Sequence, residues 1–214
     1  MGLAATVASL IPAIAAAWFL ERSQSRLRTA VHVIVMLPLV LPPVVVGYGL
    51  LKLFSPRGHL GALLEQIGAP IAFHWAGAVV AASVVGFPLF VFSIALSIRA
   101  IDRRIERMSR TLGASAWSTF CRITLPLAWP GILSGAVLSF ARGLGEFGAT
   151  IILAGRIPGE TETIPLAIYA ELDSPSGEAR IAALVLASFV ICLVSILASR
   201  FLDQWQKRRL ELKG

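Results

Sequence analysis

Long apolar stretches, separated by short charged segments, dominate the sequence. A helix needs about 17–25 residues to cross the hydrocarbon core of a bilayer. The chain is 57% hydrophobic and 14% charged, whereas soluble domains carry about 25% charged residues. We therefore predict an all-α, polytopic membrane protein with about five transmembrane helices, formed as a single domain over residues 1–214. The five apolar stretches cover residues 3–20, 29–54, 76–98, 130–154 and 179–202.

The first apolar stretch could instead be a cleaved signal peptide, since residues 15–17 resemble a cleavage site. A signal peptide carries positive charge before its apolar region, and no Lys or Arg precedes this stretch. We therefore predict a first transmembrane helix, kinked at Pro12. It begins abruptly, so a native start upstream of Met1 stays open.

Proline and glycine interrupt the second apolar stretch at Pro38, Pro42, Pro43, Gly47 and Gly49. Lipid tolerates a loosened helix only where protein or a water-filled cavity satisfies the freed backbone groups. Interrupted helices often mark transport pathways, but a plain packing kink explains the pattern equally well. We expect the third stretch to break in the same way at residues 86–88, and a short helix at residues 60–67.

Two charged residues, Arg142 and Glu146, lie near the middle of the fourth stretch, which we expect to be one helix. A charge at the bilayer centre costs about 2.5–3.5 kcal/mol on insertion scales, and the i, i+4 spacing allows the two to pair. They could line a hydrated path or a subunit interface, or form a structural ion pair. The candidates for a translocation path or for helix packing are Pro42, Pro43, Gly47, Arg142, Gly143, Glu146 and Gly148.

The same stretch carries a small residue at every fourth position. Such a ridge allows helices to approach closely in lipid, so we expect this helix to pack inside the protein. The ridge consists of Gly131, Gly135, Ser139 and Gly143.

The net charge is +7, and the positive residues are distributed unevenly between the segments that join the apolar stretches. Lys and Arg collect on the cytoplasmic side of membrane proteins, so the N-terminus should lie outside and the C-terminus in the cytoplasm. The basic charge therefore reflects topology and does not indicate nucleic acid binding. The expected cytoplasmic residues are Arg22, Arg26, Arg28, Arg99, Arg103, Arg104, Arg107, Arg110, Arg122, Arg200, Lys207, Arg208, Arg209 and Lys213; those outside are Lys52, Arg57, Arg156 and Arg180.

The outer loop 155–178 is acidic and contains one arginine, Arg156. Negative charge would disfavour direct approach of an anion, so a partner would have to deliver an anionic cargo; a simply solvated loop is an equally good interpretation. The three histidines and two cysteines share no ligand or disulfide spacing, so we expect no metal site and no other cofactor. The acidic residues of the loop are Glu160, Glu162, Glu171, Asp173 and Glu178. The histidines are His32, His59 and His74, and the cysteines are Cys121 and Cys192.

One polar segment, residues 102–126, combines dense charge with a helical repeat and a central glycine. Its apolar residues recur every three or four positions along one helix face. Gly113 should end this helix, and a second short amphipathic piece should follow until Pro126 stops it. Such an element indicates a surface for another protein, although an ordinary basic loop fits equally well. The apolar positions are Ile101, Ile105, Met108 and Leu112, then Trp117, Phe120 and Ile123.

The spacing from Gly113 to Ile123, Leu125 and Pro126 resembles the EAA loop of binding-protein-dependent ABC importer permeases, the element that docks the cytoplasmic ATPase. Where that family has Glu-Ala-Ala, this chain has residues 107–109, RMS, with an acid one position earlier. The resemblance implies a docking loop at about 99–129. Its residues would be Glu106, Arg107, Thr111, Leu112, Gly113, Ala114, Ser115, Ile123, Leu125 and Pro126.

Five stretches spread over most of the chain resemble the molybdate permeases of this family: LPLVLPPVVVGY (37–48), TLGAS (111–115), ITLPLAWPGI (123–132), FARGLGEFGATI (140–151) and IPGETETIPLAIY (157–169). Sulfate permeases share part of the pattern. The resemblance implies a type I importer permease (MetI-like) fold in a bacterial inner membrane. It also implies a second permease copy, two ATPase subunits and an external oxyanion-binding protein as partners.

The chain has no phosphate-binding motif GxxxxGK[ST], so ATP would be hydrolysed by a partner and the permease itself is no enzyme. We expect it to move molybdate by alternating access. Tungstate or sulfate remains an alternative cargo. A membrane signalling or assembly protein on the same scaffold, and an ion-coupled transporter that works without an ATPase, are alternatives of other classes.

Overall fold

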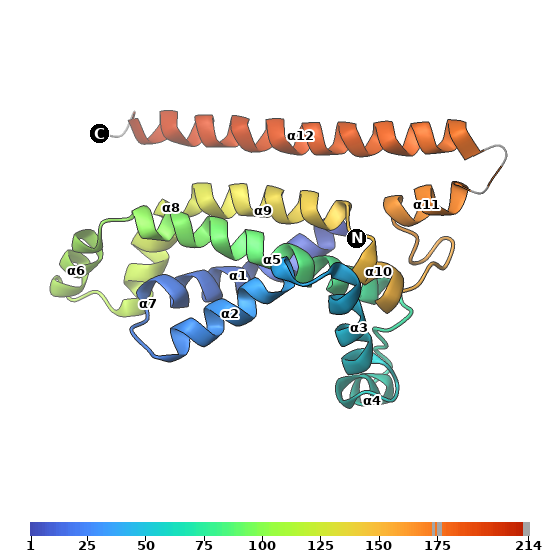
Figure 1. Cartoon of the computed structure of the whole chain (residues 1–214). Helices are drawn as coiled ribbons and strands as arrows, with labels where there is room; N and C mark the ends of the chain where they lie inside the picture. The colour runs from blue at the N-terminus through green and yellow to red at the C-terminus, as the bar shows by residue number, and fades with distance from the viewer. Residues whose placement is uncertain (173, 175–176, 212–214) are drawn as a thin grey trace.

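The structure, a computed structural model, describes residues 1–172, 174 and 177–211, without the side chains of 59, 199 and 202–211. Asp173 and Lys213, and the side chains of His59, Lys207, Arg208 and Arg209, lie outside the described residues. All regular elements in the described part are helical (Figure 1). They are α1 (Gly2–Arg22), α2 (Leu27–Val40), α3 (Pro43–Phe54), α4 (His59–Gln66), α5 (Trp75–Ala100), α6 (Arg103–Thr111), α7 (Ala116–Thr119), a π-helical turn (Phe120–Thr124), α8 (Leu125–Leu127), α9 (Trp129–Leu144), α10 (Gly148–Leu153), α11 (Ile164–Glu171) and α12 (Gly177–Glu211).

Three helices, α1, α5 and α12, are long and apolar enough to cross a membrane, and two bent pairs raise the possible number to five. The pairs are α2 with α3, which meet at 116°, and residues 116–127 with α9, which meet at 66°. The prediction of about five spans is compatible with this count, but neither the second nor the fourth span is one straight helix.

The bend between α2 and α3 lies at Leu41 and Pro42. Both residues are extended, with ψ angles of 143° and 133°, because a residue that precedes a proline is pushed out of the α region. The predicted interruption of the second stretch is thus confirmed.

The predicted break at residues 86–88 is wrong, because α5 is one continuous helix of 26 residues that contains Pro88. A transmembrane helix tolerates an internal proline where neighbouring protein covers the freed backbone groups. Here Pro88 is buried among other helices. The short helix expected at 60–67 is confirmed as α4.

The predicted glycine ridge packs against α5, which also packs against α1 in the centre of the bundle. A Cβ added to Gly131 would lie 2.3 Å from Cβ of Ser97, and one added to Gly135 would lie 2.8 Å from the Phe90 ring. Ser139 of the ridge is buried as well. Small residues therefore allow the backbone of α9 to lie in direct contact with α5. The interior position predicted for α9 is confirmed.

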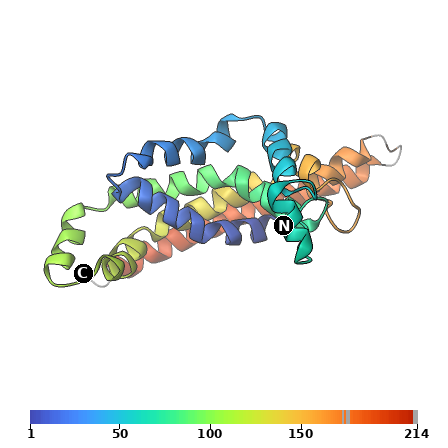
Figure 2. The same ribbon diagram turned by 90° about the horizontal axis from the view of Figure 1, so that it is seen from below.

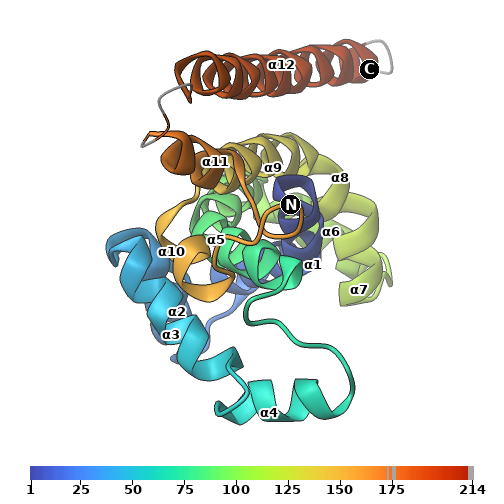
Figure 3. The ribbon, with the colours of Figure 1, turned by 90° about the vertical axis from the view of Figure 1, so that its right-hand side faces the viewer.

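The molecule is elongated, and its two ends carry different elements. α6 and α7 project at one end, beyond the C-terminal ends of α1 and α5, whereas α3, α4 and α11 lie at the other (Figures 1 and 2). Viewed along its length, the molecule has α12 on one side of the α1–α5–α9 bundle, next to α9 and α11 (Figure 3). No residue in the 18-residue apolar window of α12 is buried.

Candidate functional site

The polar connection between α5 and α9 begins with a well-capped helix. Asp102 is the N-cap of α6 and accepts a hydrogen bond from the backbone N–H of Arg104 at 2.8 Å, which satisfies one of the free donors at a helix start. The prediction placed Ile101 on the apolar face of this helix, together with three later residues. It is wrong for Ile101, which lies before α6 and is buried. The remaining three residues of the face lie on or directly after α6 and are exposed: Ile105, Met108 and Leu112.

Gly113 ends α6 in the left-handed region, with φ +90°. The N–H of Ala114 donates to the carbonyl of Ser109, and the N–H of Gly113 donates to that of Arg110, both at 3.1 Å. This is the Schellman arrangement, which favours glycine at this position. No atom lies within 4 Å of the place where a Cβ would stand. The backbone conformation, and not a lack of space, is therefore what favours glycine here.

The second half of the connection differs from the expectation at its end. Ser115 caps α7 by accepting from the N–H of Ser118 at 3.1 Å. Pro126 does not stop the helix: it lies inside α8, and the chain bends at Ala128. α8 directly follows the π-helical turn Phe120–Thr124, so Pro126 lies near the end of the continuous helical segment 116–127.

Glu106 points into the protein rather than outward. Its carboxylate lies 2.9 Å from Nε of Arg22 in α1 and accepts a hydrogen bond from the Thr124 hydroxyl at 2.7 Å. Arg22 also donates to the carbonyl of Ile98, at 2.9 Å. The side chains of Arg22 and Glu106 are only 11% and 13% exposed. One carboxylate thus joins α6 to α1 and to the π-helical turn.

A second ionic contact reinforces this junction. Arg99 of α5 pairs with the buried carboxylate of Glu21 at 2.7 Å, and Arg103 of α6 donates to the backbone carbonyl of Glu21, also at 2.7 Å. Sequence reasoning assigned no role to Glu21 or Thr124 and counted Arg22 only as a topology signal. An acid followed by an arginine directly after an apolar stretch was the available clue.

The other predicted docking residues spread over the outer side of this connection. Leu112 is 87% exposed, and two apolar-face residues outside the docking set, Met108 and Trp117, are 65% and 72% exposed. Leu125 and Ile123 are half-buried, and Leu125 packs against the main core cluster. The exposed members of the predicted set are Arg107, Thr111, Leu112, Gly113, Ser115 and Pro126, and Ala114 is partly exposed.

Arg142 and Glu146 pair at 2.7 Å, but they do not lie in the middle of one helix, as the sequence suggested. α9 ends at Leu144, so Arg142 lies in its last turn and Glu146 lies in the break before α10. Glu146 is 2% exposed, and its second oxygen accepts the N–H of Ala149 at 2.8 Å. The carboxylate thus binds the end of α9 to the start of α10.

The remaining pathway candidates lie at close helix contacts. A Cβ on Gly47 would lie 2.7 Å from Cα of Ala149, and one on Gly148 would lie 3.0 Å from Cβ of Pro43, so these residues bring α3 against α10. Gly143 faces Ala82 of α5 in the same way, and Pro42 lies at the bend. The contacts of these glycines are those of helix packing.

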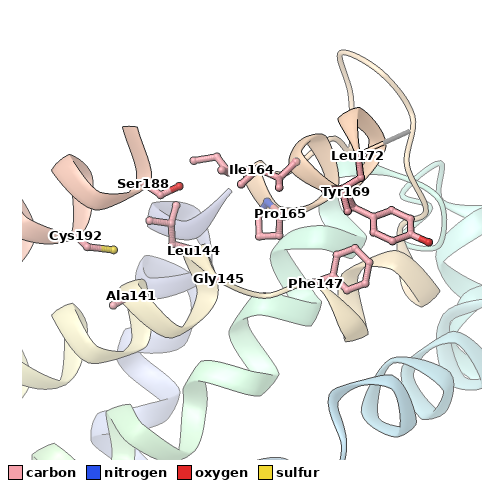
Figure 4. Close-up of a pocket in the computed structure, with 11 residues that line it drawn as sticks. Ala141, Leu144, Gly145, Phe147, Ile164, Pro165, Tyr169, Leu172, Ser188 and Cys192 are labelled. Atoms are coloured by element: carbon pink, nitrogen blue, oxygen red, sulfur yellow. The ribbon is translucent and has the colours of Figure 1, made fainter. Parts of the chain in front are cut away.

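A pocket of about 430 Å³ adjoins the break between α9 and α10 (Figure 4). Phe147 and Tyr169 pack with ring centroids 5.3 Å apart on one side, and Ser188 and Cys192 of α12 face it from the other. Most of its lining is apolar, and neither Arg142 nor Glu146 contributes to it. An oxyanion needs convergent hydrogen-bond donors, so this pocket does not fit one.

The profile of the family described as "Binding-protein-dependent transport system inner membrane component" matches residues 8–208. The chain belongs to this family. The molybdenum transport system permease protein ModB of Haemophilus influenzae is 46% identical to this permease, over 94% of the chain and 89% of the relative. ModB of Escherichia coli K12 is also 46% identical, over 90% and 85%. The sulfate transport system permease CysT of E. coli K12 is 37% identical, over 86% and 68%.

Among solved structures, a bacterial ABC transporter involved in the import of the acidic polysaccharide alginate matches this permease with a TM-score of 0.65. The match covers 97% of this chain and 77% of the other, at 21% identity, and concerns the fold alone. The predicted family and the all-α ABC importer permease fold are confirmed. The permease is therefore a multi-pass membrane protein.

Proposed function

We propose that this chain is the permease subunit of a bacterial molybdate importer. The observation that carries the proposal is the 46% identity to ModB permeases over most of both chains, against 37% to a sulfate permease. The five motifs that resemble molybdate permeases include both the polar connection and the α9–α10 break, so the similarity extends through the candidate sites.

The proposed partners follow from the family, whose description names a binding protein. A cytoplasmic ATPase dimer would dock at 99–129, and an external oxyanion-binding protein would deliver the cargo. The proposed location is the inner membrane, with the N-terminus outside and α6 in the cytoplasm. In support, the strongly basic connection lies at one end of the bundle and the acidic loop that contains Glu160 and Glu162 lies near the other (Figure 1).

A second copy of the permease is the proposed partner for α12. Apolar residues on several sides of this helix are exposed, among them Leu186, Phe189 and Leu193, and its apolar window has no buried residue. Lipid can cover some of this surface, but α12 contacts only α9 and α11 extensively within the described chain. A homodimer would give α12 a protein neighbour on a further side.

Alternating access is the proposed mechanism. Closure of the ATPase dimer on ATP would pull the two docking connections together and move the helices attached to them. Glu106 and Arg22 join α6 to α1, and Arg103 joins it to Glu21. Motion at the docking connection would therefore reach α1 and α5 directly.

Replacement of Gly113 by valine should weaken ATPase assembly while leaving membrane insertion intact. A β-branched residue at φ +90° is strained by about 1–3 kcal/mol, so the turn would rearrange and shift α7 relative to α6. Copurification of the ATPase with the variant measures the effect. Gly113→Asn is the matched control, because asparagine tolerates the left-handed region and no neighbouring atom blocks its side chain. Full assembly and uptake with valine would contradict the docking assignment.

Uptake of radiolabelled molybdate into vesicles tests the proposed function. The vesicles would contain the permease and its ATPase, with the cognate binding protein outside and molybdate, tungstate and sulfate in competition. ATP-dependent molybdate uptake that needs both partners is the expected result. Preferred sulfate uptake would instead indicate a sulfate permease. Uptake without the ATPase would indicate an ion-coupled transporter, and no uptake with all components present would favour a signalling or assembly role.

A further inference from the structure

A basic pocket of about 640 Å³ lies between the end of α1 and the α6–α7 connection. Four arginines line it, against a single carboxylate, that of Glu106. Arg22 is neutralised by Glu106 and Arg103 is bound to a carbonyl. Within the described residues, the side chains of Arg107 and Arg110 contact no acidic group. The pocket therefore carries an uncompensated positive charge.

An apolar groove of about 670 Å³ adjoins this pocket. Both cavities share Trp18, Ala116 and Phe120 as lining residues, so the groove begins where the basic pocket ends. The rest of the groove is aliphatic or aromatic and runs along the outer side of α1. It is completed by Ile11, Ile14, Ala15, Trp117 and Leu125.

Aromatic rings mark the junction of the two cavities. The Phe120 ring lies 5.7 Å from that of Trp18 and 5.5 Å from that of Trp117. Tryptophan is enriched at the level of lipid headgroups, where its ring meets both apolar and polar surroundings. Trp18 also lies one helical turn before Arg22, the last residue of the α1 membrane helix. The basic pocket is thus at headgroup depth, and the groove is at the depth of acyl chains.

We propose that these two cavities bind one anionic phospholipid. Its phosphate headgroup would lie against Arg107 and Arg110, and an acyl chain would follow the groove past Trp18 toward Ile11. A free phosphate ion would use only the basic half, whereas an amphipathic ligand fills both. Basic pockets between transmembrane helices bind the headgroups of anionic lipids in this way.

The position of the site gives the lipid a structural role. It contacts α1 on one side and both halves of the α6–α7 connection on the other. A bound lipid would therefore stabilise the arrangement that Glu106 holds by its ionic contact. This inference depends on the membrane depth of α1 and is independent of the cargo.

Native mass spectrometry of the full chain in detergent tests the proposal. The probes are phosphatidylglycerol, phosphatidylcholine with the same acyl chains, and inorganic phosphate. We expect phosphatidylglycerol to be retained at least about tenfold more tightly than phosphatidylcholine, and phosphate alone not to be retained. Arg107→Gln/Arg110→Gln should weaken phosphatidylglycerol binding roughly 25-fold, because each arginine near an anionic membrane surface raises the affinity about fivefold.

Two further variants distinguish binding of the lipid in these two cavities from general attraction of an anionic lipid to a basic surface. Arg104→Gln removes an exposed charge from the same helix outside the pocket and should leave binding unchanged. Ile11→Gln places a polar group in the groove at an exposed position and should weaken phosphatidylglycerol binding several-fold. Size-exclusion profiles check that each variant is folded.

Several outcomes would overturn the proposal. Equal binding of both lipids, or equal loss with Arg104→Gln, would mean that only general charge attraction operates. Retention of inorganic phosphate as tight as that of phosphatidylglycerol, or no effect of Ile11→Gln, would leave an anion site without a lipid. If Arg107→Gln/Arg110→Gln kept its lipid but lost the ATPase in copurification, the pocket would be part of the ATPase contact instead.

Discussion

Replacement of Arg142 by methionine is expected to destabilise the permease by about 3–5 kcal/mol, because it leaves a buried carboxylate without its counter-charge. Glu146 is 2% exposed and lies 2.7 Å from the arginine. Its remaining partner is the N–H of Ala149, a single donor that cannot replace the arginine. Thermal unfolding of the detergent-purified protein, followed by the loss of its monodisperse chromatographic peak, measures the change.

The double variant Arg142→Met/Glu146→Gln should recover most of this stability. Glutamine is neutral and still offers an oxygen to Ala149, so it removes the charge and keeps the link between α9 and α10. Two apolar replacements would lose that link. The pair Arg156–Glu162, 2.9 Å apart with an exposed Arg156, provides the control: Arg156→Met should change stability by only about 0–1 kcal/mol.

Uptake measured on the same variants separates structure from transport. If the ion pair is structural, uptake should recover together with stability in the double variant. If the double variant is as stable as the original chain but transports as poorly as Arg142→Met, the charges act directly in transport. A single variant as stable as the original chain would contradict the argument from burial.

Replacement of Glu106 by alanine is expected to detach α6 from the bundle without unfolding the protein. α6 buries none of its own residues, so polar contacts hold it, and Glu106 provides two of them. Hydrogen bonds to charged groups contribute about 1.5–3 kcal/mol each. Backbone amides of residues 103–111 should therefore exchange roughly 100-fold faster or more in hydrogen–deuterium exchange, and ATPase copurification should fall.

Two variants of α6 show whether charge and position matter. Glu106→Gln keeps an acceptor for Thr124 and should have a smaller effect than alanine. Arg104→Gln changes an exposed side chain on the same helix and should leave exchange unaltered. Unchanged exchange in Glu106→Ala would mean that Arg103 with Glu21, and Ser109 with Thr119 at 3.2 Å, are sufficient to hold α6.

The apolar pattern predicted much of the fold because a membrane requires long, internally hydrogen-bonded helices. The membrane helices α1, α5 and α12 lie within a few residues of the first, third and fifth stretches. Gly113 was also predicted correctly as the end of a helix. The spacing of small residues on α9 predicted its interior position, since that pattern reports on close approach between helices.

Helix breaks were predicted less well. Proline and glycine reduce helix stability, but packing decides whether a given residue interrupts a helix. Pro88 lies within a continuous α5, where the surrounding bundle holds the helix together. α9 instead ends at Leu144, before Glu146, a residue that the sequence suggested to be mid-helix. The bend at Ala128, two residues after Pro126, was likewise unforeseen.

The sequence by itself determined that this chain is a helical membrane protein, which segments are apolar enough to enter lipid, and where the polar connection turns at Gly113. These properties depend on local composition and on backbone preferences. The resemblance of its motifs to a known family, and not composition, indicated a permease. Only the tertiary structure decided that Glu106 turns inward to Arg22 and Thr124, and that Glu146 joins α9 to α10. The direction in which a charged side chain points depends on its partners, which lie up to 84 residues away in the chain. The spacing of residues along the sequence does not show which distant residues come into contact.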